Sequence, residues 1–263
     1  MIDQPEFLVD VGLTDLPMPI RVASREEPEG QATVAGITIN ARIMGEFEAR
    51  WIDTFVRIVH EHRGRIGTAT LKENIHDYVR ELKAMSVKVD FDYPFFVEKT
   101  TPVSHQPCLV RYLCRYTAKM ASVDEQARAI LSVQVPCLTT YPGSAPENPR
   151  GLFAQLTTMT VEVEAGGERY PEDLVELVDR HAIAPVYSYL NDEDQLWIIE
   201  RAHSEERSSV TVANSVKSEL AADPKVNWYS VRAANFGMLH SYSTVIGTEK
   251  SSWVPASGFV QEV

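Results

Sequence analysis

Apolar and polar residues alternate in several stretches of the chain. In residues 37–43, isoleucine or alanine takes every second position and polar side chains fill the positions between. A period of two places all the apolar side chains on one face of a strand, which can then be buried. The same alternation predicts strands over 87–93, 110–116, 131–135 and 159–165, and two more near 226–234 and 238–247.

Helical periodicity replaces this alternation elsewhere. Apolar residues within 47–59 and 71–82 each fall on one helical face, which predicts two helices. Further along, Pro171 is followed by two acidic residues, a combination that suits the first turn of a helix. Helical stretches are then expected from about 195 to 222, with Ser208 or Ser209 as a cap between two of them.

Proline and glycine mark the expected breaks. Residues 1–30 are rich in Pro, Asp and Glu and predict an irregular arm. Pro94 is expected to end or bulge its strand, because proline cannot donate a backbone hydrogen bond. Residues 136–151 are rich in Pro, Gly and Thr and predict a boundary between two units.

The order of strand, helix pair and strand pair occurs twice along the chain. This order predicts an α+β protein of two duplicated modules, each an antiparallel sheet with its helices on one face. The expected division is an N-terminal arm (1–30), a first module (31–140), a second module (141–250) and a C-terminal tail (251–263).

Composition narrows the possible functions of this chain of 263 residues. Its 25 Lys and Arg against 37 Asp and Glu give a net charge of −12, which argues against nucleic acids and anionic membranes as partners. No apolar stretch is long enough to predict a transmembrane helix, and the acidic N-terminus does not resemble a signal peptide. Three cysteines without a C-x-x-C spacing favour a reducing, cytoplasmic location over a disulfide framework or zinc knuckle.

Short motifs in a fixed order make the chain resemble the prokaryotic type IB GTP cyclohydrolase family from about residue 31 to 248. They are Gln31–Ala35, Tyr93–Lys99, Pro102–Ser104, Glu200–Ala202, Asn235–Phe236 and His240. The resemblance implies the tunnelling fold, with two tandem modules per chain, barrels built by several subunits, and active sites between subunits. We therefore expect a homo-oligomer, a dimer or tetramer.

The chain departs from this family at its metal ligands. Gly143 stands at the position of the metal-binding cysteine, Phe153 at that of a histidine and Pro185 at that of an acidic residue, which leaves His240 nearly alone. A metal ion needs several lone pairs that converge on one point. We therefore expect no metal and no other cofactor. Cys137 lies six positions before Gly143 and is expected to be a small apolar residue rather than a substitute ligand.

Four other residues have side chains suited to substrate binding or to acid–base chemistry. The resemblance gives Glu200 the role of anchoring a heterocycle through two N–H bonds, and the apolar residues before it predict a largely buried segment; the alternative is a glutamate on a helix surface. His240 is a candidate acid or base, or a hydrogen-bonded strand histidine. His105 stands where the family has glycine and is a second acid–base candidate, or a solvent-facing loop residue. Lys99 is a third catalytic candidate, expected to hold a carboxylate or phosphate or to stabilise a developing negative charge; the alternative is an exposed charge pair with Glu98.

Three aromatic residues, Tyr141, Phe153 and Tyr242, replace polar residues of the family. If they line the former metal pocket, that pocket suits an apolar planar substrate; otherwise they belong to the core.

These departures favour a metal-independent enzyme that condenses or cyclises an aromatic or heteroaromatic amine with a carbonyl compound, a Pictet–Spengler reaction. Such chemistry needs acid–base groups and orientation. One alternative is a GTP cyclohydrolase or another pterin-pathway enzyme with a rebuilt site, using ligands among Cys137, His105 and His240. The other is a catalytically dead paralogue that binds purines or pterins.

Overall fold

The computed structural model describes residues 8–44, 50–121, 125–147, 151–236, 239 and 241–250. The strands are β1 (Leu8–Val22), β2 (Gln31–Met44), β3 (Ala84–Thr100), β4 (Pro107–Met120), β5 (Arg128–Thr140), β6 (Ala154–Ala165), β7 (Ala184–Pro185), β8 (Val226–Asn235) and β9 (Thr244–Glu249). The helices are α1 (Arg50–His62), α2 (Thr68–Leu82), α3 (Pro171–His181), α4 (Asp192–Ser204) and α5 (Ser209–Ala222).

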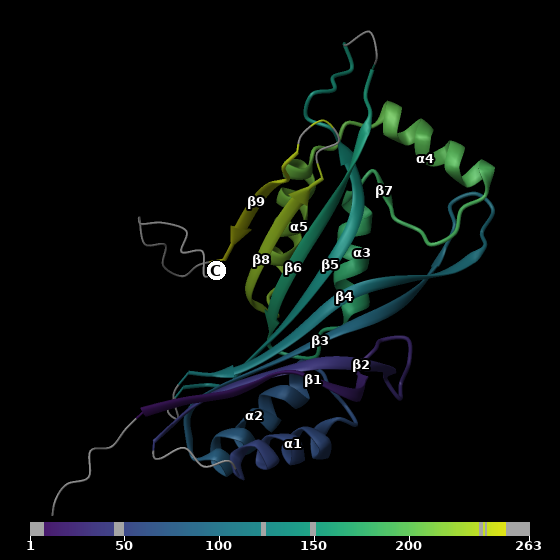
Figure 1. The fold of residues 1–263 in the computed structure, drawn as a ribbon. Coiled ribbons are helices and arrows are strands. Elements are labelled where there is room, and N and C mark those ends of the chain that lie inside the picture. The colour runs from purple at the N-terminus through teal and green to yellow at the C-terminus, as the bar shows by residue number, and fades with distance from the viewer. Residues whose placement is uncertain are drawn as a thin grey trace, which may run out of the picture.

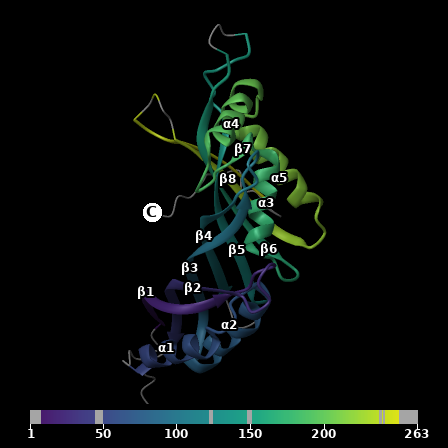
Figure 2. The same cartoon turned by 90° about the vertical axis from the view of Figure 1, so that its right-hand side faces the viewer.

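Within these ranges the strands form one antiparallel sheet, in the order β1-β2-β3-β4-β5-β6-β8-β9, with the short β7 paired to β5. The sheet is long and strongly twisted, with α1 and α2 near the β1–β3 end and α3 and α5 against β5, β6 and β8 (Figures 1 and 2). This arrangement confirms the predicted α+β class, and it confirms the strands predicted from the alternating stretches of β2 to β6.

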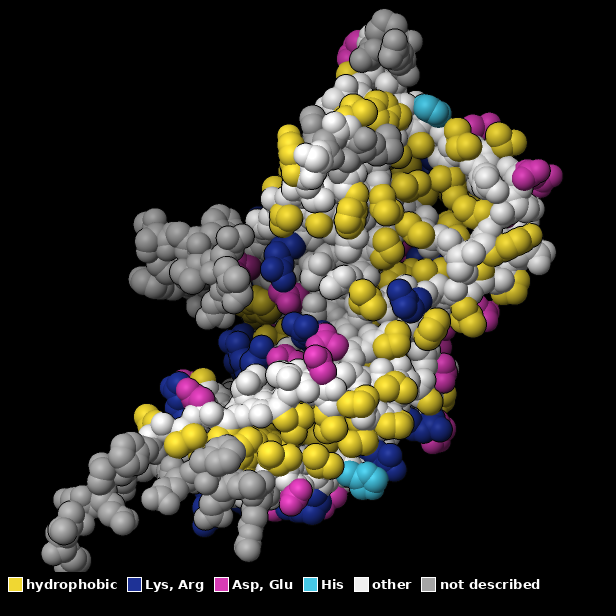
Figure 3. Space-filling view, viewed as in Figure 1, with side chains coloured by type: hydrophobic (Ala, Val, Ile, Leu, Met, Phe, Trp, Pro, Cys, Tyr) yellow, Lys and Arg dark blue, Asp and Glu magenta, His cyan; other side chains and the backbone are white. Residues whose placement is uncertain are grey.

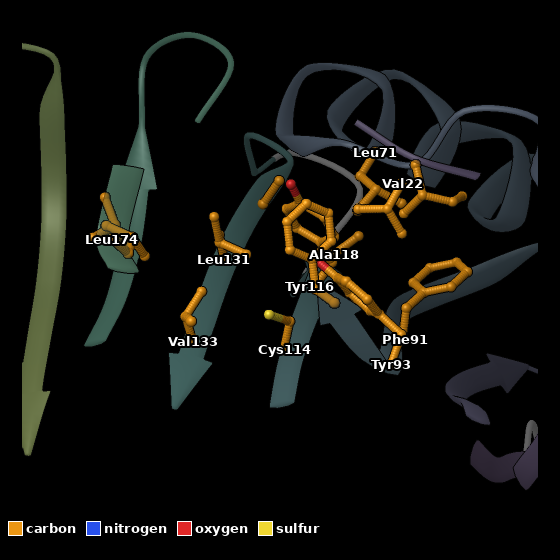
Figure 4. Packing of buried hydrophobic residues seen from close by; sticks show 14 of the residues in the cluster. Val22, Leu71, Phe91, Tyr93, Cys114, Tyr116, Ala118, Leu131, Val133 and Leu174 are labelled. Atoms are coloured by element: carbon orange, nitrogen blue, oxygen red, sulfur yellow. The ribbon is translucent and has the colours of Figure 1, made fainter. Parts of the chain in front are cut away.

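One continuous core joins both ends of the sheet. Alternate residues of every strand from β2 to β8, apart from the two-residue β7, are buried in the same apolar cluster as residues of α1, α2, α3 and α5. Figure 4 shows part of this core, from Leu71 of α2 to Leu174 of α3. Two helix starts match their sequence signals: Pro171 opens α3, and the Ser208 side chain accepts a hydrogen bond from the Thr211 backbone N–H at the start of α5.

The opposite face of the sheet is polar. Ion pairs cross between neighbouring strands there, including Arg42–Asp10, Arg115–Asp92 and Arg232–Glu162. The last two pairs line a groove of about 600 Å³. Charged side chains gather over the middle of the sheet in Figure 3, whereas apolar ones gather near α4. The charges in this groove are already neutralised by one another.

Three local predictions are wrong. Residues 8–22 form β1, which pairs along its length with β2, so that stretch is not an irregular arm. β3 continues through Pro94, because the β2 ladder ends at Asp92 and the missing proline N–H costs no bond to β2. The break expected to begin at Pro136 begins only after Thr140, since β5 stays paired with β6 to that residue.

The division into two modules at residue 140 stays a prediction, because pairing continues without interruption through the middle of the sheet. The expected tail, 251–263, lies outside the described residues. At its two ends the sheet presents β1 and β9, each paired on one side in the described part of the chain, and open edges of this kind favour pairing with another chain. The homo-oligomer likewise stays a prediction. Among the described helices, none has the length and apolar character needed to cross a membrane.

Candidate functional site

A pocket of about 360 Å³ opens at one end of the sheet, where β5 and β8 end and β6 and β9 begin. These four termini meet because the strands are antiparallel neighbours. The pocket is lined by Tyr141, Pro142, Gly143, Gln155, Asn235, Tyr242 and Thr244. Two of the three aromatic residues predicted to form one cluster therefore line it directly.

A chain of hydrogen bonds lies beneath the pocket. The hydroxyl of Thr157 donates to Asn235 Oδ1 at 2.9 Å, so the hydroxyl of Thr139, 2.7 Å away, must donate to Thr157. Asn235 Nδ2 donates in turn to Thr244 Oγ1 at 3.1 Å, and Gln155 Nε2 lies 3.5 Å from Thr139 Oγ1. These contacts fix the orientation of two amides in the pocket wall, so that the wall presents polar groups in set positions.

The third aromatic residue, Phe153, does not line the pocket but packs behind Tyr141 of its wall. The rings of Phe153 and Tyr141 are stacked, with centroids 4.8 Å apart and planes at 16°. A Cβ atom at Gly143 would lie 3.0 Å from Cε1 of Tyr141, so any larger residue there would press on this ring. The stack therefore occupies space that a side chain at position 143 would need.

The end of α4 is fastened to the same region. The Arg207 backbone N–H donates to Thr140 Oγ1 at 2.7 Å, and the Thr140 N–H donates to the Arg207 carbonyl at 2.8 Å. The Thr140 hydroxyl also donates to the carbonyl of Glu205, the residue that follows α4, at 3.3 Å. Since Thr140 directly precedes Tyr141, the last turns of α4 lie beside the pocket.

Glu200 belongs to these last turns and is exposed. The prediction that its segment is largely buried is wrong: Leu196 and Ile199 are 59% and 49% exposed, and Asp194 is the buried residue of this helix. The helix crosses the end of the sheet instead of lying on the core (Figure 1). No hydrogen bond or ion pair of the Glu200 carboxylate is found within the described residues, so it is available to a ligand.

Lys99 is neither exposed nor at the pocket. Its ammonium lies 2.5 Å from Asp179 Oδ2 of α3, and its side chain is only 9% exposed. It also lies 5.3 Å from the ring centre of Tyr112 and 5.9 Å from that of Tyr187. Burial raises the pKa of Asp179, and Lys99 partly offsets that effect. Lys99 thus holds a carboxylate of its own chain, and the alternative of an exposed charge pair is wrong because this pair is nearly buried.

His105 lies in the exposed loop between β3 and β4, where its φ of +52° suits the glycine that the family has at this position. Asp194 of α4 holds this loop by accepting hydrogen bonds from the N–H groups of Val103 and Ser104, both at 2.9 Å. Burial disfavours its charge, but the hydrogen bonds from the Ser104 hydroxyl and the backbone outweigh that effect and lower the pKa of Asp194 to about 2. The loop therefore serves to position α4.

The structure thus brings Tyr141, Phe153 and Tyr242 together, places Glu200 on the helix beside them, and keeps Lys99 and His105 elsewhere. His240 lies outside the described residues. Gln155 and Asn235 also belong to the pocket wall and were not predicted as site residues, although Asn235 lies in one of the family-like motifs.

The residues present do not fit a metal ion. Positions 143, 153 and 185 carry Gly, Phe and Pro, none of which offers a side-chain lone pair for a metal. Burial raises the pKa of the Cys137 thiol to about 12, which keeps it protonated and unsuited to binding a metal. In the parts of the chain that the structure describes, no three His, Cys, Asp or Glu side chains converge on a common point.

Comparison with known proteins shows which family the chain belongs to. The family described as type I GTP cyclohydrolase folE2 matches residues 4–245. The chain belongs to this family. The GTP cyclohydrolase FolE2 of Citrifermentans bemidjiense is 30% identical over 241 residues, which are 92% of this chain and 89% of the relative. The protein of the same name from Geobacter sp. strain M21 is 29% identical, with the same coverage.

Solved structures confirm the tunnelling fold. Uricase from Arthrobacter globiformis aligns with a TM-score of 0.50 at 9% identity, covering 98% of both chains. A hyperthermostable urate oxidase mutant from Bacillus sp. TB-90 aligns with a TM-score of 0.57 at 8% identity, covering 93% of this chain and 99% of that one. At such low identity these likenesses bear on the fold alone.

The predicted Pictet–Spengler reaction is wrong. Relatives that match about nine-tenths of the chain are named GTP cyclohydrolases, which points to GTP chemistry and not to the condensation of an aromatic amine with a carbonyl compound. That prediction treated the loss of metal ligands as evidence for a new reaction, whereas such a loss bears only on how a reaction is performed.

The absence of a bound metal stays a prediction that can be measured. We expect the purified chain to hold no stoichiometric zinc or iron, because the donor atoms at three ligand positions are gone. Elemental analysis by mass spectrometry checks this expectation. A stoichiometric metal that is lost in Cys137→Ala would contradict it and would make Cys137 a ligand.

Proposed function

We propose that this chain binds GTP and opens its guanine ring system as a GTP cyclohydrolase whose site has been rebuilt around the aromatic pocket. Membership of the family over residues 4–245 supports GTP as the ligand. The observation that carries the proposal is the pocket itself, which lies where the family resemblance puts the site and combines aromatic rings with two oriented amides.

The pocket suits a planar heterocycle. The ring of Tyr242, 61% exposed at the pocket mouth, offers a face on which a base can stack, and such stacking contributes about 1–3 kcal/mol. The amides of Gln155 and Asn235 offer donors and acceptors to the polar edges of a base. Glu200 adds a carboxylate that accepts N–H bonds from an amidine-like edge such as that of guanine.

A second function is binding of GTP or a related purine without turnover. The observation that favours it is the replacement of three family ligand positions by residues without donor atoms. The two functions share the pocket and differ in whether product forms.

Calorimetric titration with GTP and product analysis test both functions. We expect GTP to bind in the range of about 1 µM to 1 mM, ATP to bind more weakly, and a pterin-like chromophore to appear together with loss of GTP. Tyr242→Ala should weaken GTP binding about tenfold, whereas Phe96→Ala, an exposed aromatic of β3 outside the pocket, should leave it unchanged.

Binding without product would favour the non-catalytic function. No GTP binding at millimolar concentration, or equal loss of affinity in both variants, would contradict the proposal.

A further inference from the structure

An imidazole lies beside the pocket although the family's histidine position is occupied by Phe153. His203, on the last turn of α4, is exposed, and its Nδ1 lies 2.5 Å from the carbonyl oxygen of Leu152. Leu152 directly precedes Phe153, whose ring stacks on Tyr141 of the pocket wall. A helix remote in sequence thus brings a histidine next to the position from which one is missing.

The contact with Leu152 fixes how protons are distributed on this ring. A carbonyl oxygen can only accept, so Nδ1 must carry the hydrogen and donate it. In the neutral ring, Nε2 then carries the lone pair and is free to take up a proton. A histidine held in one tautomer by a backbone carbonyl, with no hydrogen-bond partner on its second nitrogen within the described residues, has the arrangement of a general base.

No charged side chain near His203 pairs with its imidazole within the described residues, so the ring is available as a general base. On its own segment Glu200 lies one turn earlier, and Arg201 is paired with Glu205, with 2.9 Å between Nη2 and Oε2. The facing segment, Leu152–Phe153, has no titratable side chain, and Tyr141 is the titratable group behind it. Residues three apart on a helix are neighbours, so Glu200 and His203 lie on the same side of α4.

We propose that His203 is the proton acceptor and donor of this site, an inference that rests on the proposed function. Nε2 takes a proton from a water molecule as the water oxygen bonds to the ring carbon between the two nitrogens of the five-membered ring. The electron pair of the C=N double bond moves to the ring nitrogen, which then receives the proton back from the imidazolium. The net change is addition of one water across the C=N bond, and His203 returns to its neutral form.

Two substitutions separate this role from a structural one. His203→Asn keeps an N–H at the place of Nδ1, and so the bond to Leu152, but removes Nε2. His203→Gln places its amide at Nε2 and loses the Nδ1 donor. We expect kcat for GTP to fall about 100-fold or more in both, with KM little changed and the acid limb of the pH–rate profile lost. His76→Asn, an exposed histidine of α2 in the first half of the chain, should behave as the unchanged chain does.

The outcome for His203→Asn decides the proposal. If this variant keeps both its kcat and the acid limb, the histidine is structural and the proposal is overturned. Nitrogen-15 spectra of the histidine rings, assigned by the missing signal in His203→Gln, should show the Nδ1–H tautomer; the opposite tautomer would also overturn it.

A failure of the proposed function is distinguishable from a failure of this inference. Absence of product in the unchanged chain contradicts the cyclohydrolase function. The His203 signals then decide the inference: a change at Nε2 on addition of GTP, with the His76 signals constant, supports contact with the ligand, and no change overturns it.

Discussion

Lys99→Met is expected to lower the free energy of unfolding by about 3 kcal/mol, because it leaves the Asp179 carboxylate nearly buried without its cation. Asp179 Oδ1 already lacks a hydrogen-bond partner within the described residues, and Oδ2 is paired with Lys99, so the substitution removes the cation that compensates this carboxylate. Urea denaturation followed by circular dichroism measures the change. The matched control is Arg115→Met, which breaks an exposed pair with Asp92 and should cost less than about 1 kcal/mol.

The effect of Lys99→Met should depend on pH in a defined direction. Burial already raises the pKa of Asp179, and loss of Lys99 raises it further. A carboxyl whose pKa is raised in the folded state destabilises the fold progressively as the pH rises from the unfolded pKa to the folded one, and fully above the folded one. The loss of unfolding free energy caused by Lys99→Met should therefore become smaller as the pH falls towards the ordinary carboxyl pKa of about 3.9. A deficit that grows on acidification, or one no larger than that of Arg115→Met, would contradict the buried-pair interpretation.

Removal of both partners gives a second check on this pair. Lys99→Met combined with Asp179→Leu leaves no buried charge, and we expect it to recover most of the lost stability. The recovery would show that the pair stabilises little by itself and that the unpaired carboxylate causes the loss.

The strands of the sheet were largely predictable, and the reason is burial of one face. β2 to β6 carry apolar side chains at alternate positions because the helices cover only one side of the sheet. β1 was missed because it lies at an edge, where few of its side chains are buried and the strand is held mainly by backbone pairing with β2. Such pairing leaves no periodic trace in the sequence.

The site was predictable only in part. The resemblance pointed to Tyr141, Phe153 and Tyr242, which come together through the register of four antiparallel strands. Contacts between distant segments were not predictable: Asp179, the partner of Lys99, is 80 residues away, and the carbonyl that accepts from His203 is 51 residues away. The exposure of α4 was also missed, since its apolar residues suggested a helix packed on the core.

The exposure of α4 alters what is expected of Glu200. A carboxylate open to water gives less to a ligand than a buried one, because the ligand must displace bound water. Glu200 still has a favourable place, on the same side of α4 as His203 and beside the pocket, and no partner within the described residues competes for it. Its apolar neighbours Leu196 and Ile199 are exposed in the single chain, so the surroundings of Glu200 would become drier if a second chain covered them.

We therefore expect Glu200→Gln to weaken GTP binding by about 2 kcal/mol, or roughly 30-fold in Kd, with the thermal unfolding temperature unchanged. The substitution keeps the size of the side chain but replaces one acceptor oxygen by an N–H₂ group, which opposes an N–H donor of the guanine edge. Glu193→Gln, in the exposed first turn of the same helix, removes the same charge away from the pocket and should leave Kd within about twofold. Calorimetry on both variants gives the comparison. Equal affinities would mean that Glu200 does not anchor the base, and that the rings of Tyr141 and Tyr242 with the amides of the pocket wall hold it without a carboxylate.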